Sequence, residues 1–157
     1  MDEFDLDPYL RRLIEAFNDH DIDRYTDQYT EDLIFQDPMT DEATRAELRE
    51  EVLELFEGFP DARIEPKRVI SSRDSTALQM AFVGTHDGPY KGIPPTGEYA
   101  HVPAVMVTRI TNDGISYRRD YWDRQAYREE LGLTFPAVLG HLPRFMAWTL
   151  RERLTAI

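Results

Sequence analysis

The spacing of apolar residues changes once along this chain, and that change sets the class of fold. Up to about residue 60 apolar side chains recur every three to four residues, and from about residue 62 they alternate with polar ones. The first pattern is typical of helices that bury one face, and the second of half-buried antiparallel strands. We therefore expect an α+β fold with helices first and an antiparallel meander after them.

The first helix is marked at its start by Asp7 and Pro8, a common pair at a helix N-terminus. Four apolar residues follow at the spacing of one helical face: Leu10, Leu13, Ile14 and Phe17. This helix therefore has an apolar face that packs against the rest of the fold.

A shorter helix and a strand are expected next. The helix runs through Arg24, Tyr25 and Tyr29, so both tyrosines lie on one helical face. The apolar run 33–35 then predicts a strand that stops at Asp37, because the next residue is a proline, which cannot continue a central ladder.

The third helix begins at Thr44, which forms a capping-box pattern with Glu47, and ends before Pro60. Residues 86–97 hold too many glycines and prolines for regular structure, so we expect a long loop there. Four segments of alternating pattern predict strands, the last two joined by the hairpin turn Asn112-Asp113-Gly114: residues 62–72, 76–85, 99–110 and 115–123.

The C-terminal part departs from this pattern. Residues 125–131 predict a short helix stopped by Gly132, and Pro143 predicts the start of another apolar-periodic helix. We therefore divide the chain into a domain, 1–133, and a C-terminal helical extension, 134–157. The extension contains large apolar side chains that require burial, either on the domain or at an interface: Phe145, Met146 and Trp148.

The charge of the chain excludes some partners. Its 30 acidic and 18 basic residues give a net charge of -12, which repels nucleic acid and anionic membranes. No apolar run is long enough to span a bilayer, and the N-terminus is acidic where a signal peptide would be basic. We expect a soluble, cytoplasmic protein. Only two of the basic residues are lysines, an imbalance typical of proteins from salt-accumulating halophiles.

Several separated motifs carry a family resemblance: Gly84-Thr85-His86, Gly92-Ile93-Pro94-Pro95-Thr96-Gly97, Arg109, Gly114-Ile115, Asp120-Tyr121-Trp122-Asp123 and Leu131-Gly132-Leu133. In this order they resemble the SnoaL-like polyketide and ester cyclases of the ketosteroid isomerase and nuclear transport factor two-like superfamily. The resemblance implies helices packed on a strongly curved, mostly antiparallel sheet that forms a cone-shaped barrel with an apolar pocket. It also implies acid/base chemistry on a small apolar molecule, with no metal and no cofactor.

Asp120 is the first candidate for that chemistry. Strand alternation places Arg118, Asp120 and Trp122 on one face and Asp123 on the other, where it is expected to cap the next helix. Asp120 matches the catalytic aspartate of the similar limonene epoxide hydrolase. In an apolar pocket the pKa of its carboxyl group would rise, which suits proton transfer. The alternative is a structural ion pair with Arg118 or Arg119.

His86 and Asp37 are the other candidates. His86 ends a strand beside the long loop and could act as base or orienting partner of Asp120, or bond only to backbone. Asp37 matches the general base of ketosteroid isomerase, but an aspartate before a turn often only accepts backbone N–H groups. The two oxyanion donors of that isomerase fall on Leu13 and Met106, which cannot donate hydrogen bonds. The resemblance therefore argues against ketosteroid isomerisation itself.

The remaining expectations concern ligand contacts and assembly. His101 shares the outer sheet face with Tyr99 and Tyr117, where we expect a homodimer contact. No ligand spacing for a metal, no nucleophile elbow and no dinucleotide-binding glycine motif is present. Six residues are expected to contact a substrate: Tyr25, Tyr29, Phe35, Phe82, Met106 and Trp122.

Together these features predict a cofactor-free enzyme in which Asp120, helped by His86 and by Arg118 or Asp37, moves a proton on an apolar carbonyl or epoxide. The reaction would be an intramolecular aldol cyclisation, an isomerisation or a ring-opening hydrolysis. The rival interpretation is a non-catalytic member of the same fold that binds a small apolar ligand or serves as an association module.

Overall fold

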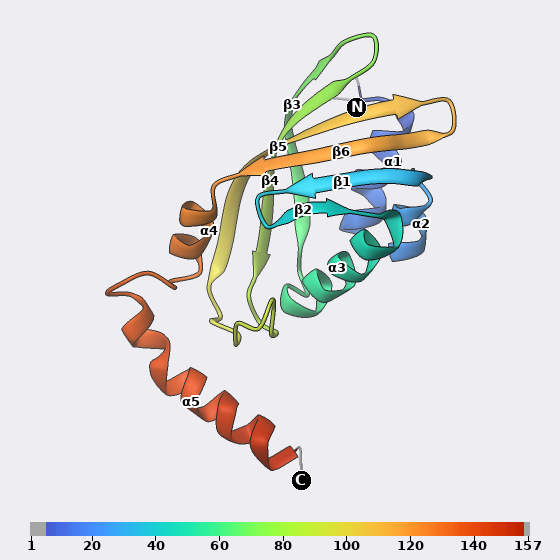
Figure 1. Cartoon of the computed structure of the whole chain (residues 1–157). Helices are drawn as coiled ribbons and strands as arrows, with labels where there is room; N and C mark the ends of the chain where they lie inside the picture. The colour runs from blue at the N-terminus through green and yellow to red at the C-terminus, as the bar shows by residue number, and fades with distance from the viewer. Residues whose placement is uncertain (1–5, 156–157) are drawn as a thin grey trace.

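The computed structural model describes residues 6–155, and it combines helices with one curled sheet (Figure 1). The helices are α1 (Pro8–Asn18), α2 (Ile22–Thr26), α3 (Arg45–Gly58), α4 (Arg124–Glu130) and α5 (Val138–Thr155). The strands are β1 (Tyr29–Asp37), β2 (Thr40–Ala43), β3 (Arg63–Ser71), β4 (Thr76–Thr85), β5 (Tyr99–Thr111) and β6 (Gly114–Trp122). The predicted α+β class is confirmed.

The six strands form one sheet in the order β2-β1-β6-β5-β4-β3. All neighbouring strands are antiparallel except β1 and β6, which run parallel. The sheet curls strongly, but β2 and β3 remain as two edges, so it does not close into a complete barrel (Figure 1). The concave side of the sheet faces α1 and α3, and the core lies between them.

The predicted helix starts agree with the structure because each is fixed by a local hydrogen bond. The Asp7 carboxylate accepts a bond from the backbone N–H of Tyr9, and Thr44 and Glu47 form the reciprocal capping box of α3. The Asp123 carboxylate caps α4 by accepting from two backbone N–H groups, as predicted. Such caps satisfy donors that the first helical turn leaves unpaired.

Three local features differ from what the sequence predicted. Tyr29 is the first residue of β1 and not part of the second helix, because α2 ends after five residues at Thr26. Strand β2 was not predicted, since its sequence TDEA is mostly polar and pairs with β1 as an exposed edge. Pro143 lies inside α5 and does not start it; α5 begins five residues earlier, at Val138.

The C-terminal helix α5 extends away from the sheet and from the other helices (Figure 1). None of its residues is buried, and its contacts with the domain are concentrated at its first turns. There, Arg144 donates a hydrogen bond to the carbonyl of Thr96, and His141 lies 3.7 Å from the Glu98 carboxylate. Of the two expected places for the extension, on the domain or at an interface, the domain therefore buries very little of it.

Candidate active site

A cavity of about 130 Å³ opens between the concave face of the sheet and the helices α1 and α3. This volume is similar to that of an engineered apolar cavity, about 150 Å³, that binds a benzene molecule. Most of its lining is apolar, from residues such as Phe17, Val52 and Val102. Seven polar or ionisable residues also line it: Tyr25, Asp37, Glu51, Tyr90, Arg118, Asp120 and Tyr127.

Asp120 enters this cavity because of strand alternation. Arg118 and Asp120 are 6% and 8% exposed and line the cavity, whereas Tyr121 is 50% exposed on the outer face. A strand turns successive side chains to opposite faces, so residues 118, 120 and 122 share the inner one. The predicted assignment of the two faces is confirmed.

The Asp120 carboxylate is held by the guanidinium of Arg118 in a bidentate contact. Nε of Arg118 donates to one carboxylate oxygen at 2.9 Å, and Nη2 donates to the other at 2.5 Å. Such a bidentate contact between two charged groups is stronger than a hydrogen bond between neutral ones. The ion pair that we considered as an alternative role for Asp120 is therefore present, and it lies inside the cavity.

The third nitrogen of Arg118 connects this pair to two tyrosines. Nη1 donates to the hydroxyl oxygens of Tyr25 and Tyr29, at 2.5 and 2.6 Å, and Tyr29 donates its own proton to Tyr25 at 3.1 Å. The Tyr25 hydroxyl thus accepts two bonds, and its own proton has no acceptor among the hydrogen bonds of the described residues. Tyr25 lines the cavity and Tyr29 does not. Tyr25 therefore offers a donor at the cavity wall.

Burial and charge fix the protonation of Arg118 and Tyr29. Burial tends to lower the pKa of Arg118, but the charge of Asp120 and the two tyrosines outweigh it, and its pKa lies well above the ordinary value. Burial raises the pKa of Tyr29 well above its ordinary value, with Arg118 opposing the shift. Arg118 is therefore charged and Tyr29 neutral across the pH range in which proteins are stable.

Asp37 lies at the rim of the cavity, where it accepts hydrogen bonds. One of its carboxylate oxygens accepts from the backbone N–H groups of Met39 and Thr40, both at 2.7 Å. This is the turn-capping role that we considered as the alternative to a base. Asp37 lines the cavity but makes no contact with Asp120.

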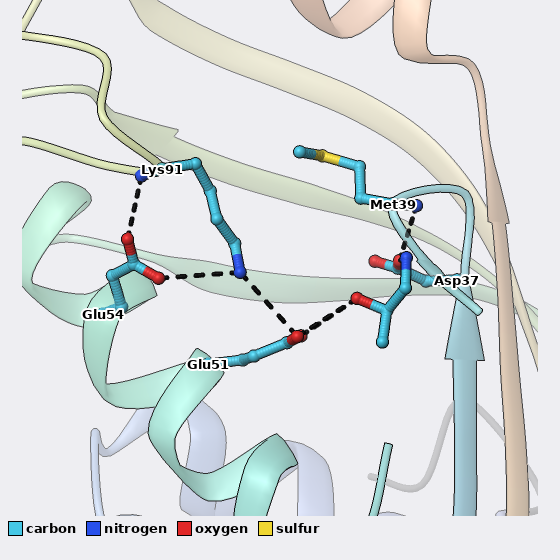
Figure 2. A network of polar contacts seen from close by, with 6 residues as sticks. Asp37, Met39, Glu51, Glu54 and Lys91 are labelled. Atoms are coloured by element: carbon cyan, nitrogen blue, oxygen red, sulfur yellow. Dashed lines mark hydrogen bonds and ion pairs between the residues drawn. The ribbon is translucent and has the colours of Figure 1, made fainter. Parts of the chain in front are cut away.

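The rim is tied together by a network of charged side chains (Figure 2). Lys91 lies 3.7 Å from the Glu51 carboxylate and 3.5 Å from that of Glu54, and its backbone N–H donates to Glu54. Glu51 in turn accepts a hydrogen bond from the Thr40 hydroxyl. The network joins α3, the β1–β2 turn and the long loop (Figure 2). Together with Asp37, the rim therefore carries three carboxylates, those of Asp37, Glu51 and Glu54, and one lysine.

His86 does not join Asp120, and this prediction was wrong. Its backbone N–H bonds to Glu98, whereas Asp120 pairs with Met106, eight residues further along β5. Eight residues of a strand span about 26 Å. The separation arises because His86 lies beside the start of β5 and Asp120 beside its middle.

The His86 ring is instead part of the core. It is fully buried, stacks on Phe59 at 5.0 Å, and accepts a hydrogen bond from the backbone N–H of Thr96. Burial lowers the pKa of His86 to about 4, with Asp87 opposing the shift. The imidazole is therefore neutral at pH 7 and holds the long loop, which agrees with the backbone-bonded alternative.

Of the six predicted ligand contacts, Tyr25, Phe35, Phe82 and Trp122 line the cavity. Met106 and Tyr29 do not. Met106 is completely buried opposite Asp120 on the neighbouring strand, so its side chain fills the core below the cavity. An alternating pattern identifies the inner face of a strand but cannot separate packed positions from positions that border a void.

Two tyrosines of the cavity were missed by the sequence analysis. Tyr90 lies in the long loop, and Tyr127 lies in α4 and packs edge-on against Trp122 at 5.5 Å. The length of the loop was a usable signal for Tyr90, since long loops often carry functional side chains. No local pattern distinguishes Tyr127 from any other apolar-face residue of a short helix.

The described residues, 6–155, contain no group of three or more histidine, aspartate or glutamate side chains placed to hold a metal ion. Within the same range, no helix has the length and apolar content needed to cross a membrane. The site consists of a carboxylate, a guanidinium and a tyrosine hydroxyl at the wall of an apolar cavity. Such a set can accept a proton and donate a hydrogen bond to a neighbouring oxygen.

Comparison with solved structures shows the same fold in several bacterial proteins. AclR from Streptomyces galilaeus is 21% identical, with a TM-score of 0.72, over 80% of this chain and 94% of that one. IdmH from Streptomyces antibioticus is 20% identical, with a TM-score of 0.70, over 79% and 96% of the two chains. TsrD from Streptomyces laurentii is 18% identical, with a TM-score of 0.72, over 83% and 100%. At these identities the likeness shows the fold alone.

No curated protein matches the sequence. The family model for the SnoaL-like polyketide cyclase matches residues 8–131, which include the cavity, the Asp120–Arg118 pair and α4 but not α5. This match covers most of the chain and agrees with the curled sheet and its covered concave face. The chain belongs to the SnoaL-like polyketide cyclase family.

Proposed function

We propose that this protein is a cofactor-free acid/base enzyme that acts on a small, neutral, apolar carbonyl or epoxide compound. The observation that carries the proposal is the joint placement of the Asp120 carboxylate and the Tyr25 hydroxyl on one guanidinium at the wall of an apolar cavity. The carboxylate can take a proton, and the hydroxyl can stabilise the oxygen on which negative charge develops. An intramolecular aldol cyclisation is the leading reaction, before isomerisation and epoxide hydrolysis.

The chemical step begins with proton removal. The Asp120 carboxylate takes a proton from the carbon beside a carbonyl group, and the electron pair of the broken C–H bond becomes the C=C bond of an enolate. The Tyr25 hydroxyl donates a hydrogen bond to the enolate oxygen, and Arg118 adds positive charge. The enolate carbon then attacks a second carbonyl of the same molecule, and the new alkoxide regains the proton from Asp120.

The cavity limits the substrate by size and charge. A volume of about 130 Å³ accepts a compound of roughly one ring. The rim carries Asp37, Glu51 and Glu54 against Lys91, and the whole chain carries a net charge of -12. This field repels anions, so the substrate enters as a neutral molecule.

Exchange of hydrogen for deuterium in cyclohexanone tests the proton-transfer step, and it does not require the natural substrate to be known. We expect the protein to accelerate exchange at the carbons beside the carbonyl in D₂O, as followed by proton NMR. General bases of this kind contribute about 10²- to 10⁴-fold. Ala104→Phe adds a large side chain to the cavity wall opposite Trp122 and changes no residue of the polar cluster, so it should abolish the acceleration.

The rival function is ligand binding without catalysis, and one observation favours it: both oxygens of Asp120 are already engaged by Arg118. Calorimetric binding of cyclohexanone with no acceleration of exchange would establish the rival. Acceleration that persists in Ala104→Phe would place the exchange outside the cavity and refute catalysis at this site.

We also propose that the protein forms a homodimer. Exposed apolar side chains lie on the outer sheet face, including Tyr99 and the cross-strand pair Val105 and Tyr121, while His101 is exposed and Tyr117 half-buried there. A second exposed apolar set forms a stripe along α5: Leu139, Leu142, Met146, Leu150 and Leu154. Residues 134–157 contain three arginines and one glutamate, whereas residues 1–133 contain 29 acidic and 15 basic residues. Charge thus favours packing of α5 on the acidic domain of a second copy.

Light scattering during size-exclusion chromatography measures this assembly directly. We expect the mass of a dimer for the full chain and that of a monomer for the triple variant Leu142→Gln, Met146→Gln, Leu150→Gln. Ala147→Gln, which changes an exposed residue outside the stripe on the same helix, should remain dimeric. A monomeric parent chain would refute the proposal.

A further inference from the structure

The hydroxyl group of Tyr127 is a buried polar group that the proposed chemistry leaves unused. The residue is 8% exposed, lines the cavity, and its hydroxyl oxygen has no hydrogen-bond partner among the described residues. Buried hydroxyl groups are nearly always paired, because an unpaired one loses its bonds to water without replacement. An exception at the wall of a cavity suggests a partner that comes from the ligand.

Tyr90 provides a second hydroxyl in the same cavity. It lines the cavity from the long loop, and its hydroxyl makes no hydrogen bond to the described residues. Burial raises the pKa of Tyr90 well above its ordinary value, with Tyr127 and three carboxylates adding to the shift. Burial alone raises the pKa of Tyr127. Both groups therefore remain protonated and can donate hydrogen bonds.

This pair lies away from the Asp120 end of the cavity. Trp122 follows Asp120 by two positions on the same face of β6, a step of about 6.7 Å along a strand, and Tyr127 packs on the side of Trp122. Apolar side chains, including Ala104 and Phe82, line the same cavity. The Tyr127 hydroxyl and the Asp120 carboxylate are thus separate polar groups at the wall of one mostly apolar cavity.

We propose that the Tyr90 and Tyr127 hydroxyls form a second binding subsite, which accepts an uncharged oxygen of the ligand, such as a second carbonyl. The subsite selects compounds that carry two oxygen functions across one ring or its equivalent. This inference rests on the proposed function in one respect: the reacting carbonyl of the ligand lies beside Tyr25 and Arg118, as the proposed function places it. A bifunctional substrate is also what an intramolecular aldol reaction needs.

Binding of 1,4-cyclohexanedione and of cyclohexanone, measured by isothermal titration calorimetry, tests the subsite. We expect the parent chain to bind the dione more tightly, and Tyr127→Phe to weaken dione binding about two- to tenfold while leaving cyclohexanone binding unchanged. Tyr117→Phe is the matched control, since its hydroxyl bonds to Gln36 on the outer face. It should leave both affinities unchanged.

Thermal unfolding supplies a second, independent measurement. Because the Tyr127 hydroxyl has no partner within the chain, Tyr127→Phe should leave the melting temperature unchanged or raise it. A lower melting temperature would reveal an internal partner and overturn the subsite. Equal affinity of the parent chain for both ketones, or an unaltered dione preference in Tyr127→Phe, would also overturn it.

The two proposals fail in different ways. If the parent chain shows no preference for the dione but still accelerates exchange of cyclohexanone, the subsite alone is refuted. A dione preference that depends on Tyr127, without any exchange, refutes catalysis and retains the subsite. If the parent chain binds neither ketone, both proposals are refuted.

Discussion

Asp120→Asn is expected to lower the free energy of unfolding by about 3 to 5 kcal/mol, because it leaves the charge of Arg118 buried without its partner. Arg118 is 6% exposed, and it donates one hydrogen bond to each of the two carboxylate oxygens of Asp120. An amide can accept only one of these hydrogen bonds and carries no charge. Chemical denaturation followed by circular dichroism measures the loss.

A double variant distinguishes an unpaired charge from a general loss of packing. Asp120→Leu combined with Arg118→Met removes both charges and keeps similar volumes, so we expect it to recover most of the stability that Asp120→Asn loses. If Asp120→Asn unfolds at the same denaturant concentration as the parent chain, Asp120 does not stabilise the buried charge of Arg118. Loss of activity in Asp120→Asn can therefore be assigned to catalysis only when the variant is shown to be folded.

Tyr25→Phe is expected to lower the rate of cyclohexanone exchange by about 10²- to 10³-fold, the usual effect of removing one oxyanion donor. Tyr25 lines the cavity, and its own proton is the one not donated within the cluster. Binding of cyclohexanone should change much less than the rate, because the donor acts mainly on the charge that develops during reaction.

Tyr29→Phe is the matched control. Both tyrosine hydroxyls accept a hydrogen bond from the same nitrogen of Arg118, so both variants should lose similar stability, about 1.5 to 3 kcal/mol. Tyr29 does not line the cavity, and its proton is donated to Tyr25. The rate of cyclohexanone exchange should therefore fall less than about tenfold in Tyr29→Phe. Equal rates in the two variants would remove Tyr25 from the proposed chemistry.

Much of the fold was predictable because it depends on local signals. Caps at Asp7, Thr44 and Asp123 fixed helix starts, and alternation gave strand β4 its observed bounds. The errors fell where local signals are weak or conflict with tertiary contacts. The polar strand β2 forms only because β1 offers it an edge, and the helix around Pro143 continues despite the missing N–H.

The candidate site was predictable only in part. Alternation along β6 correctly placed Asp120 and Arg118 on the inner face, since that requires only the period of a strand. It could not show that Arg118 also reaches Tyr25 and Tyr29. These two contacts join residues 93 and 89 positions apart, and no spacing rule covers such separations.

The class of fold, the family and the carboxylate that faces the interior could all be predicted from the sequence, because each depends on periodicity or on motifs that are local in the chain. Which side chains meet depends instead on how the whole chain folds. Strand register places His86 beside the start of β5 and Asp120 beside its middle. The folded chain brings Tyr90 from the long loop and Tyr127 from α4 to the wall of one cavity. Such distances depend on strand register and curvature, which arise only when the whole sheet has formed.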